Sequence, residues 1–190
     1  MVQALREIIE LSEFDEASLK EALSSFRCVD PEEASAQDVM RFLSEDAVDM
    51  ERKGTTRTYL ILNDESWAEG EVRIDGYFSI ALKVLFFSKD IDAGLLEETF
   101  GNPKQVNCPA YLIGQLARSE TAEKGSGREY LKFALQYIAE ASDIVGGRFV
   151  YLDCVPEKQR YYEKEGFRFL QNKHKSGLVQ MYRVICRFFL

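Results

Sequence analysis

The sequence predicts an α/β protein with a mixed sheet of about six to seven strands flanked by helices. Three observations lead to this class. Residues 72–88 alternate apolar and polar side chains, as a half-buried strand does. Residues 148–155 form a nearly continuous apolar run, which is typical of a buried parallel strand. Residues 35–53 repeat apolar side chains at helical spacing.

The first sixty residues are predicted to be mainly helical. Residues 3–11 fit either a helix or a first strand, and residues 15–25 fit a helix. Residues 35–53 form a clearer helix, which begins at a pattern resembling a capping box and ends at Gly54. Its apolar stripe recurs on one helix face, at Val39, Leu43, Ala47 and Met50.

The middle of the chain is predicted to contain an antiparallel hairpin. Residues 55–63 are rich in strand-forming side chains, and a polar turn at 63–70 leads to residues 72–88. The second strand is unusually long, so we expect a bend or bulge in it, near Gly76. One face is expected to be apolar, with Val72, Ile74, Phe78, Ile80, Leu82, Val84 and Phe86. The other face is expected to carry Arg73, Asp75, Tyr77, Ser79 and Lys83.

The second half is predicted to alternate between strand and helix. It begins with a polar insertion at 89–107, which contains a short helix at 95–99. The elements that follow are, in order, a strand at 110–118, a glycine-containing turn at 120–127, a helix at 127–142, a strand at 148–155, a short helix at 156–165, and strands at 167–170 and 178–185.

Composition argues against several classes of protein. Apolar residues make up 46% of the 190-residue chain, enough for the core of one domain. No apolar run is long enough to span a bilayer, and the acidic start does not fit a signal peptide. We therefore expect a cytoplasmic protein. The scattered cysteines favour reduced thiols over a disulfide framework or a zinc site: Cys28, Cys108, Cys154 and Cys186.

The charge is unevenly placed along the chain. The net charge of −8 argues against general binding to nucleic acid, which needs Lys and Arg opposite the phosphates. Residues 1–60 hold 14 acidic and 7 basic side chains, whereas residues 156–190 hold 3 acidic and 8 basic ones. An anionic ligand near the C-terminal third therefore fits the charge pattern, although a solvated basic face accounts for it equally well.

A glycine-containing turn before a predicted helix carries the clearest chemical signal. It reads Ala122-Glu-Lys-Gly-Ser-Gly-Arg128. Gly125 and Gly127 allow several backbone N–H groups to point into one concavity, where the helix adds its positive dipole end. Lys124 and Arg128 can add charge-assisted contacts to a pyrophosphate. A plain tight turn has the same pattern, and the turn is neither a Walker A loop nor a dinucleotide fingerprint.

With this turn and a later stretch, the chain resembles the GNAT family of N-acetyltransferases. Residues 112–131, which contain GQLARSETAEKGSGREYL, look like that family's strand, pyrophosphate loop and helix. Residues 149–167, FVYLDCVPEKQRYYEKEGF, look like its later strand and its "fYek-GF" ending. The resemblance covers residues from about 55 to the end and implies a sheet splayed at its centre. The whole chain, residues 1–190, is expected to form one GNAT-like domain. Ala122 departs from the family loop, which usually has Gln or Arg there.

The resemblance implies acetyl-CoA as co-substrate and no metal. In this family the acyl-pantetheine arm lies between the strands that correspond to 110–118 and 148–155. The backbone groups expected to hold the arm, one of them polarising the thioester carbonyl, belong to Leu116, Ala117 and Arg118. The residues expected to hold the pyrophosphate are Glu123, Lys124, Gly125, Ser126, Gly127 and Arg128.

Tyr162 is the tyrosine of the "fYek-GF" pattern, and the resemblance implies that it protonates the departing CoA thiolate. The alternative is a packing tyrosine. Three carboxylates lie in roughly suitable places for a general base: Glu71, Asp75 and Glu120. His174 is expected to be solvated in the last turn. Cys154 has no identifiable partner base and is not expected to be a nucleophile.

The sequence therefore predicts an N-acetyltransferase in which a primary amine attacks acetyl-CoA directly, in a ternary complex. The acceptor is expected to be a small-molecule or protein amine. One alternative is a toxin-type acetyltransferase acting on aminoacyl-tRNA, and another is a non-catalytic module that binds CoA or a protein. A membrane partner is not expected. The apolar tail at 188–190 is compatible with a homodimer interface or with a plug in the core.

Overall fold

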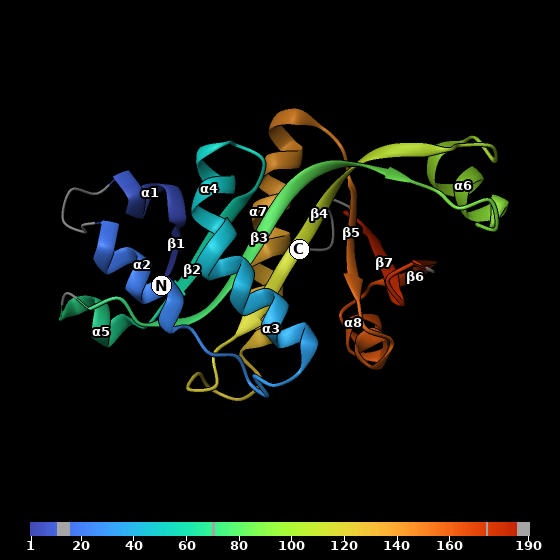
Figure 1. Cartoon of the computed structure of the whole chain (residues 1–190). Coiled ribbons are helices and arrows are strands. Elements are labelled where there is room, and N and C mark those ends of the chain that lie inside the picture. The colour runs from blue at the N-terminus through green and yellow to red at the C-terminus, as the bar shows by residue number, and fades with distance from the viewer. Residues whose placement is uncertain (11–15, 70, 174, 186–190) are drawn as a thin grey trace. The chain divides into compact units, whose positions relative to one another are not determined.

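The computed structural model describes residues 1–10, 16–69, 71–173 and 175–185. In these residues seven strands form one mixed sheet in the order β1-β2-β3-β4-β5-β7-β6, with helices on its flanks (Figure 1). The predicted α/β class is confirmed. The chain divides into two compact units, which are described separately. The first unit contains residues 1–81 and 113–137, and the second contains residues 82–112 and those from 138 onward.

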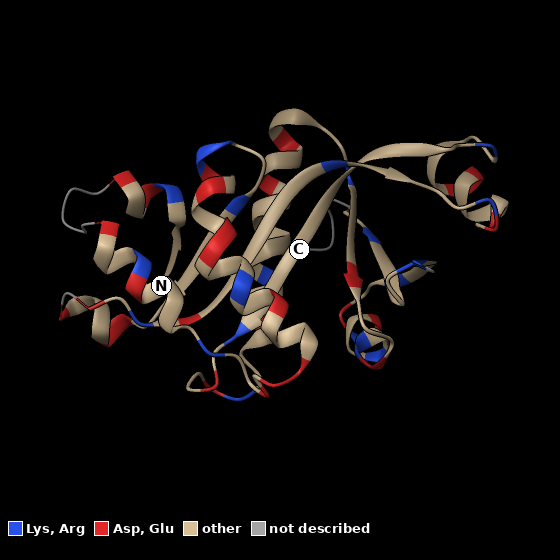
Figure 2. Ribbon diagram, viewed as in Figure 1, with Lys and Arg blue, Asp and Glu red and all other residues tan. Residues whose placement is uncertain are grey.

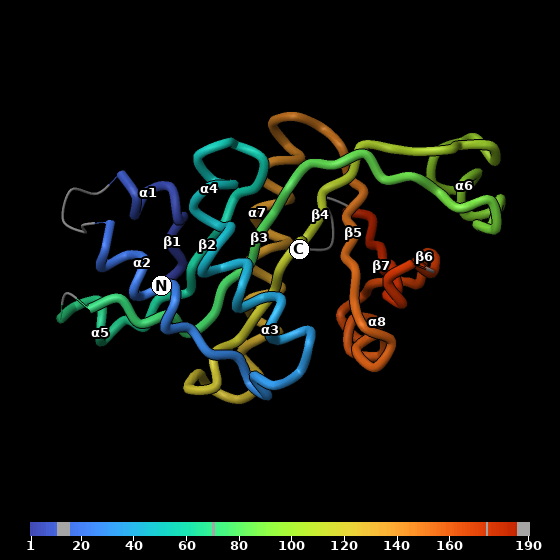
Figure 3. Tube along the Cα trace, viewed as in Figure 1, coloured from blue at the N-terminus to red at the C-terminus, as the bar shows by residue number. Residues whose placement is uncertain are grey.

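The first unit contains the N-terminal helices and a three-stranded antiparallel ladder, which Figure 3 traces along the chain. Its elements are β1 (Val2–Ala4), α1 (Leu5–Glu10), α2 (Glu16–Ser25), α3 (Ala34–Arg41), the π-helical turn η1 (Phe42–Asp46), α4 (Ala47–Arg52), β2 (Arg57–Leu62) and α5 (Asp64–Ala68). Three longer elements continue from one unit into the other: β3 (Ile74–Phe86), β4 (Asn107–Arg118) and α7 (Gly127–Val145). Residues 3–11 thus contain both the strand and the helix between which the sequence left the choice open.

Both faces of the sheet are buried in the first unit. Leu60 and Tyr77 pack into a cluster with apolar side chains from α1 to α4. On the opposite face, the ring of Tyr137 in α7 lies 4.2 Å from Tyr59 and 6.0 Å from Phe78, between centroids. The expectation that Tyr77 lies on a polar face was therefore wrong: its side chain is fully buried. Alternation along one strand does not reveal that helices cover both sides.

A bulge interrupts the ladder between β2 and β3. Ile61 pairs with Gly76 but Leu62 pairs with Ile74, so Asp75 is an additional residue in β3. The predicted irregularity near Gly76 is confirmed. The predicted turn at 63–70 instead contains the helix α5, which has only five residues and too few turns to show a periodic pattern.

The second unit contains the remaining parts of β3, β4 and α7 together with the C-terminal elements. These are α6 (Ala93–Phe100), β5 (Phe149–Cys154), the 3₁₀ turn η2 (Pro156–Lys158), α8 (Gln159–Lys164), β6 (Arg168–Lys173) and β7 (Leu178–Val184). Strand β5 pairs antiparallel with β7, and β7 pairs antiparallel with β6. The helix in the insertion, the buried strand, the short helix and the closing hairpin are confirmed. Residues 186–190, with the apolar tail and Cys186, lie outside the described residues, as does His174.

Aromatic side chains fill the core of the second unit. The ring of Phe149 stacks on Tyr182 at 5.1 Å and also lies near Phe100. In β3 the side chain that joins this core is Leu85, which is 3% exposed. Three side chains expected on a buried face of this strand point outward instead: Leu82, Val84 and Phe86. The prediction was wrong here because helices cover both faces of β3 up to Ala81, whereas from Leu82 to Phe86 only the face that carries Leu85 is buried.

The described helices include none that is long and apolar enough to cross a membrane. Three described cysteines are buried free thiols: Cys28, Cys108 and Cys154. Among the described residues, no three His, Cys, Asp or Glu side chains are placed to hold a metal ion.

Candidate functional site

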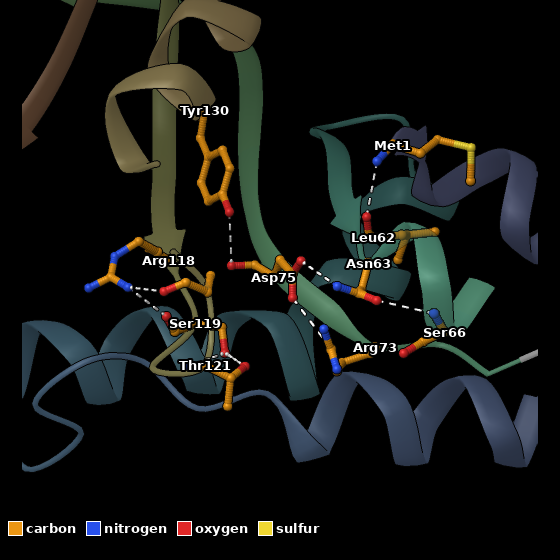
Figure 4. A network of polar contacts seen from close by, with 11 residues as sticks. Met1, Leu62, Asn63, Ser66, Arg73, Asp75, Arg118, Ser119, Thr121 and Tyr130 are labelled. Atoms are coloured by element: carbon orange, nitrogen blue, oxygen red, sulfur yellow. Dashed lines mark hydrogen bonds and ion pairs between the residues drawn. The ribbon is translucent and has the colours of Figure 1, made fainter. Parts of the chain in front are cut away.

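Arg118, the last residue of β4, fixes the loop that follows it. One nitrogen of its guanidinium, Nη1, donates to the carbonyl oxygens of Ser119 (3.2 Å) and Ala122 (2.7 Å) (Figure 4). Within the loop, the Ser119 hydroxyl accepts from the backbone N–H of Thr121 at 3.2 Å. The start of the loop is tied to the N-terminal region as well, since the N–H of Glu120 donates to the carbonyl of Arg27. The sequence suggested a role only for the backbone of Arg118, whereas its side chain shapes the loop.

The loop between β4 and α7 presents several backbone N–H groups at the start of a helix of 19 residues. The N–H groups of Ser126 and Arg128 donate to loop carbonyls and are occupied. Four further loop N–H groups make no hydrogen bond to another described residue: those of Glu123, Lys124, Gly125 and Gly127. These donors, beside the positive end of the α7 dipole, suit an anion such as a pyrophosphate.

The two loop glycines contribute in different ways. Gly125 has φ of 100°, a left-handed conformation that other residues rarely adopt. The φ of Gly127 lies outside that region, and a Cβ atom added there would meet no atom within 4 Å. Gly125 is therefore required by the backbone, whereas Gly127 leaves open space next to the first turn of α7.

The first turn of α7 rests on the bulge in β3. The carbonyl oxygen of Asp75 accepts from the N–H of Ser119 at 2.8 Å and from the hydroxyl of Tyr130 at 3.3 Å. The Tyr130 ring lies directly over Gly76, where an added Cβ would be 2.3 Å from the ring carbon Cε2 and 2.7 Å from the carbonyl oxygen of Ala117. One bulge thus anchors both ends of the loop. Sequence reasoning missed Tyr130, and the one signal for this contact was a glycine within a strand.

The carboxylate of Asp75 belongs to a polar network at the same bulge. Its Oδ2 accepts from the side-chain amide of Asn63 at 3.2 Å, and its Oδ1 lies 3.6 Å from Nε of Arg73 (Figure 4). The side chain is 20% exposed. Glu71 and Glu120 are exposed. None of the three carboxylates is thereby identified as a general base.

Strand β4 extends well beyond its ladder with β5. That parallel ladder consists of Tyr111 with Val150 and Leu112 with Tyr151, while β4 continues to Arg118. The backbone of Leu116 to Arg118 is therefore not used in that ladder. Ala117 is buried and the flanking two side chains are half-buried.

Tyr162, on α8, belongs to the second unit. Its side chain is 9% exposed and packs edge-on against the rings of Tyr161 and Phe167. Burial raises the pKa of the Tyr162 hydroxyl well above 10, and Cys154 and Tyr161 raise it further. The hydroxyl therefore stays protonated near neutral pH, and it has no hydrogen-bond partner among the described residues. Burial also raises the pKa of the Cys154 thiol to about 11, so few thiolates form at neutral pH.

No protein-family model and no curated protein matches the sequence. Solved structures do match it over nearly its whole length. AtaT complexed with acetyl-methionyl-tRNAfMet is similar with a TM-score of 0.69 and 16% identity, covering 97% of this chain and 94% of that one. AtaTR bound with acetyl-CoA matches with a TM-score of 0.65 and 16% identity, covering 97% and 92%. A tyrosine-to-phenylalanine variant of KacT matches with a TM-score of 0.67 and 15% identity, covering 95% and 92%.

At these identities the likeness concerns the fold. AtaT and KacT are acetyltransferase toxins of the GNAT family. The order of helices and strands, the loop before α7 and the mixed sheet agree with this, and the fold of this chain is that of the GNAT acetyltransferases.

Proposed function

We propose that this chain is an N-acetyltransferase that transfers the acetyl group of acetyl-CoA to a primary amine. The observation that carries the proposal is the loop before α7, which offers open space at Gly127 and four N–H groups that bond to no other described residue, in a GNAT fold. Two of the solved neighbours, AtaTR and an AtaT variant with its antitoxin segment, contain acetyl-CoA.

The residues of the loop fit the anionic part of this co-substrate. The N–H groups of Lys124, Gly125 and Gly127 would hold the pyrophosphate, with charge added by Lys124 and Arg128. The backbone from Leu116 to Arg118, which the ladder with β5 does not use, would hold the pantetheine arm by hydrogen bonds of the kind that pair two strands. An N–H of this segment would polarise the thioester carbonyl. Ala122 lacks a side-chain donor, so binding would depend on the backbone and on the tether from Arg118.

In the proposed reaction the nitrogen of the amine bonds to the thioester carbon, and the C–S bond then breaks. The amine loses a proton and the CoA sulfur gains one, so the step needs no oxidant or metal. The protonated hydroxyl of Tyr162 would supply the proton to the sulfur. The amine proton would pass to water or to one of the carboxylates near the site.

The structural neighbours favour an aminoacyl-tRNA over a small amine as acceptor. AtaT has been solved with acetyl-methionyl-tRNAfMet, and the α-amino group of an aminoacyl-tRNA is a primary amine. The acidic and basic residues, coloured in Figure 2, are distributed unequally between the two units. This distribution affects whether the chain would attract a tRNA. By sequence, the first unit carries 22 acidic and 12 basic residues, and the second carries 10 acidic and 12 basic ones. By net charge, a large polyanion such as tRNA would therefore be attracted by the second unit and repelled by the first.

The proposal is tested by thermal unfolding with acetyl-CoA, with desulfo-CoA and ATP as controls. A ligand at about a hundred times its Kd stabilises the folded protein by about 2.7 kcal/mol, which raises the Tm by several degrees in a domain of this size. We expect this shift with acetyl-CoA and desulfo-CoA but not with ATP. No shift at millimolar acetyl-CoA would refute the proposal.

Two glycine variants test whether acetyl-CoA binds at this loop. Gly127→Ala adds a methyl group into open space, so the Tm without ligand should stay close to that of the wild type while the acetyl-CoA shift shrinks. Gly125→Ala should lower the Tm without ligand, because alanine disfavours a φ of 100°. An undiminished shift in Gly127→Ala would place acetyl-CoA elsewhere.

The acceptor is identified by following radiolabelled acetyl groups. The protein is incubated with labelled acetyl-CoA and either a charged tRNA pool or a panel of small amines and protein lysines. Label in the aminoacyl group of the tRNA supports an aminoacyl-tRNA acceptor. Label in a small amine or in a protein lysine supports an amine acceptor of that kind. A chain that binds acetyl-CoA but labels neither would be a non-catalytic binding module.

A further inference from the structure

A pocket of about 350 Å³ in the second unit is lined by three arginines. It lies between α6 and the ends of β5, β6 and β7, and its volume is within the range for small-molecule sites. The guanidinium groups come from Arg148, Arg168 and Arg183, and among the described lining residues the one carboxylate is that of Glu98. The other lining residues are Leu95, Thr99, Gly166, Tyr182 and Val184.

The strand pairing explains why three arginines from separate segments meet. Arg148 directly precedes β5, whose first residue, Phe149, pairs with Val184 near the end of β7. Arg168 begins β6 and pairs with Tyr182, next to Arg183. Since β7 lies between β5 and β6, all three arginines reach the same end of this part of the sheet.

Most of this positive charge is uncompensated within the described chain. Nη1 of Arg183 donates to the carbonyl of Glu165 at 3.1 Å, which uses one of its five N–H donors. The side chains of Arg148 and Arg168 make no ion pair or hydrogen bond with a described residue. Like charges gathered around one cavity repel each other, so an anion bound there would relieve the repulsion.

The backbone of β7 adds a donor to the same pocket. The N–H of Ile185 donates to the carbonyl of Arg148, so it points toward β5. Successive residues of a strand direct these groups to opposite sides, and the N–H of Val184 therefore points toward the β6 side. The ladder between β6 and β7 begins only at Arg168 and Tyr182, which leaves Val184 beyond its end.

We propose that this pocket binds a phosphate group. Planar guanidinium groups with paired N–H donors match phosphate oxygens, and three of them outweigh the carboxylate of Glu98. The site uses none of the residues proposed to hold acetyl-CoA, so it does not depend on that proposal. The phosphate belongs either to an RNA backbone or to a free phosphate or phosphorylated small molecule, and the experiment separates these sources.

The test uses two double variants of the whole chain. Arg148→Ala with Arg168→Ala removes two exposed pocket charges, and Lys89→Ala with Lys104→Ala removes two exposed charges of the same unit outside the pocket. Arg183 is left intact because it caps the end of α8. Binding of a short fluorescent single-stranded RNA is followed by anisotropy over a range of salt. Stabilisation by inorganic phosphate is compared with chloride at equal ionic strength.

We expect the arginine double variant to weaken binding of RNA, of phosphate or of both at least about tenfold, as for lost charge-assisted bonds. For RNA, the slope of log K against log salt should also fall by about 1.4, or roughly 0.7 per lost contact. The lysine double variant should lose much less. Glu98→Gln should act in the opposite direction and tighten binding, since it removes a negative charge that faces the arginines.

The outcomes are separable. Binding of RNA that depends on the arginines makes the source a nucleic-acid backbone, and arginine-dependent stabilisation by phosphate alone makes it a free phosphate. Equal losses in the two double variants, or no binding of either probe, would overturn the phosphate site. The acetyl-CoA shift, measured on the same variants, reports separately on the proposed acetyltransferase function.

Discussion

Two properties of Tyr162 bear on its proposed role as a proton donor. The hydroxyl is kept protonated by burial, and no described residue accepts a hydrogen bond from it. A tyrosine whose pKa is raised above 10 remains a donor through the whole range in which enzymes are usually assayed. Loss of activity at mildly alkaline pH would therefore have to come from another group.

Replacing Tyr162 with phenylalanine removes only the hydroxyl. If it protonates the CoA thiolate, kcat should fall by about a hundredfold or more while KM for acetyl-CoA changes little. Release of CoA is followed with a thiol reagent. Tyr161→Phe is the matched control, because the centroids of the Tyr161 and Tyr162 rings lie 5.1 Å apart. The kcat of this variant should stay near that of the wild type. Equal rates for the two variants would make Tyr162 a packing residue.

Only some residues of the candidate site could be predicted from the sequence. Gly125 was recognisable because few other residues allow a left-handed turn before a helix. The tether from the side chain of Arg118 and the docking of Tyr130 on Gly76 were missed. Both depend on contacts whose geometry no local pattern encodes, and Gly76 lies 54 residues from Tyr130 in the chain.

Among the elements, the connection between α4 and β2 is held by a buried carboxylate. Oε1 of Glu51 accepts from Nη1 of Arg57 at 2.9 Å, and Oε2 accepts from the N–H of Thr58 at 2.8 Å. The Glu51 side chain is only 2% exposed, whereas that of Arg57 is 43% exposed. The carboxylate therefore links the end of a helix to the first residues of a strand.

Glu51→Gln keeps the shape of this side chain but gives it a donor where it had an acceptor. One of the two bonds is lost, and the free energy of unfolding should fall by about 1.5–3 kcal/mol. Urea unfolding measures this. Asp49→Asn, at the exposed pair with Lys53, is the control and should change stability little. Similar midpoints for both variants would show that the buried bonds contribute no more than surface ones.

The order and type of most elements followed from periodicity, but their exposure did not. The helix predicted at 35–53 is present as α3, η1 and α4, and the predicted hairpin is β2 with β3. The burial of Tyr77 and the exposure of Leu82 could not be read from the strand alone. Both depend on which helices cover each stretch of β3, and that is decided by tertiary packing.

In the whole molecule, several buried groups make the free energy of unfolding pH-dependent in the alkaline range. Burial raises the pKa of the Cys108 and Cys154 thiols from 9.0 to about 11, and that of Tyr151 from 10.0 to about 12. The unfolded chain releases these protons at lower pH than the folded chain does. Stability is therefore unaffected by these groups below about pH 9 and falls as pH rises from there toward 12.

Replacing both thiols tests this linkage. In the double variant Cys108→Ala with Cys154→Ala, the loss of stability between pH 9 and 11 should be smaller than in the wild type. Chemical unfolding under reducing conditions, repeated at each pH, provides the comparison. The absolute stability of the variant will be lower because of the lost packing, so the slope with pH is the measured quantity. An unchanged slope would contradict the predicted role of the thiols.

The dependence of the loop on the bulge in β3 limits how far this site can be transplanted. A fragment that begins at β4 would carry every glycine and cation of the loop, yet it would lack the carbonyl of Asp75 and the bare backbone of Gly76. In another scaffold the same sequence would lack the contacts that fix the conformation of this loop. The loop is thus not a portable module, and scaffolds able to accept it are those whose neighbouring strand offers a bulge followed by a glycine.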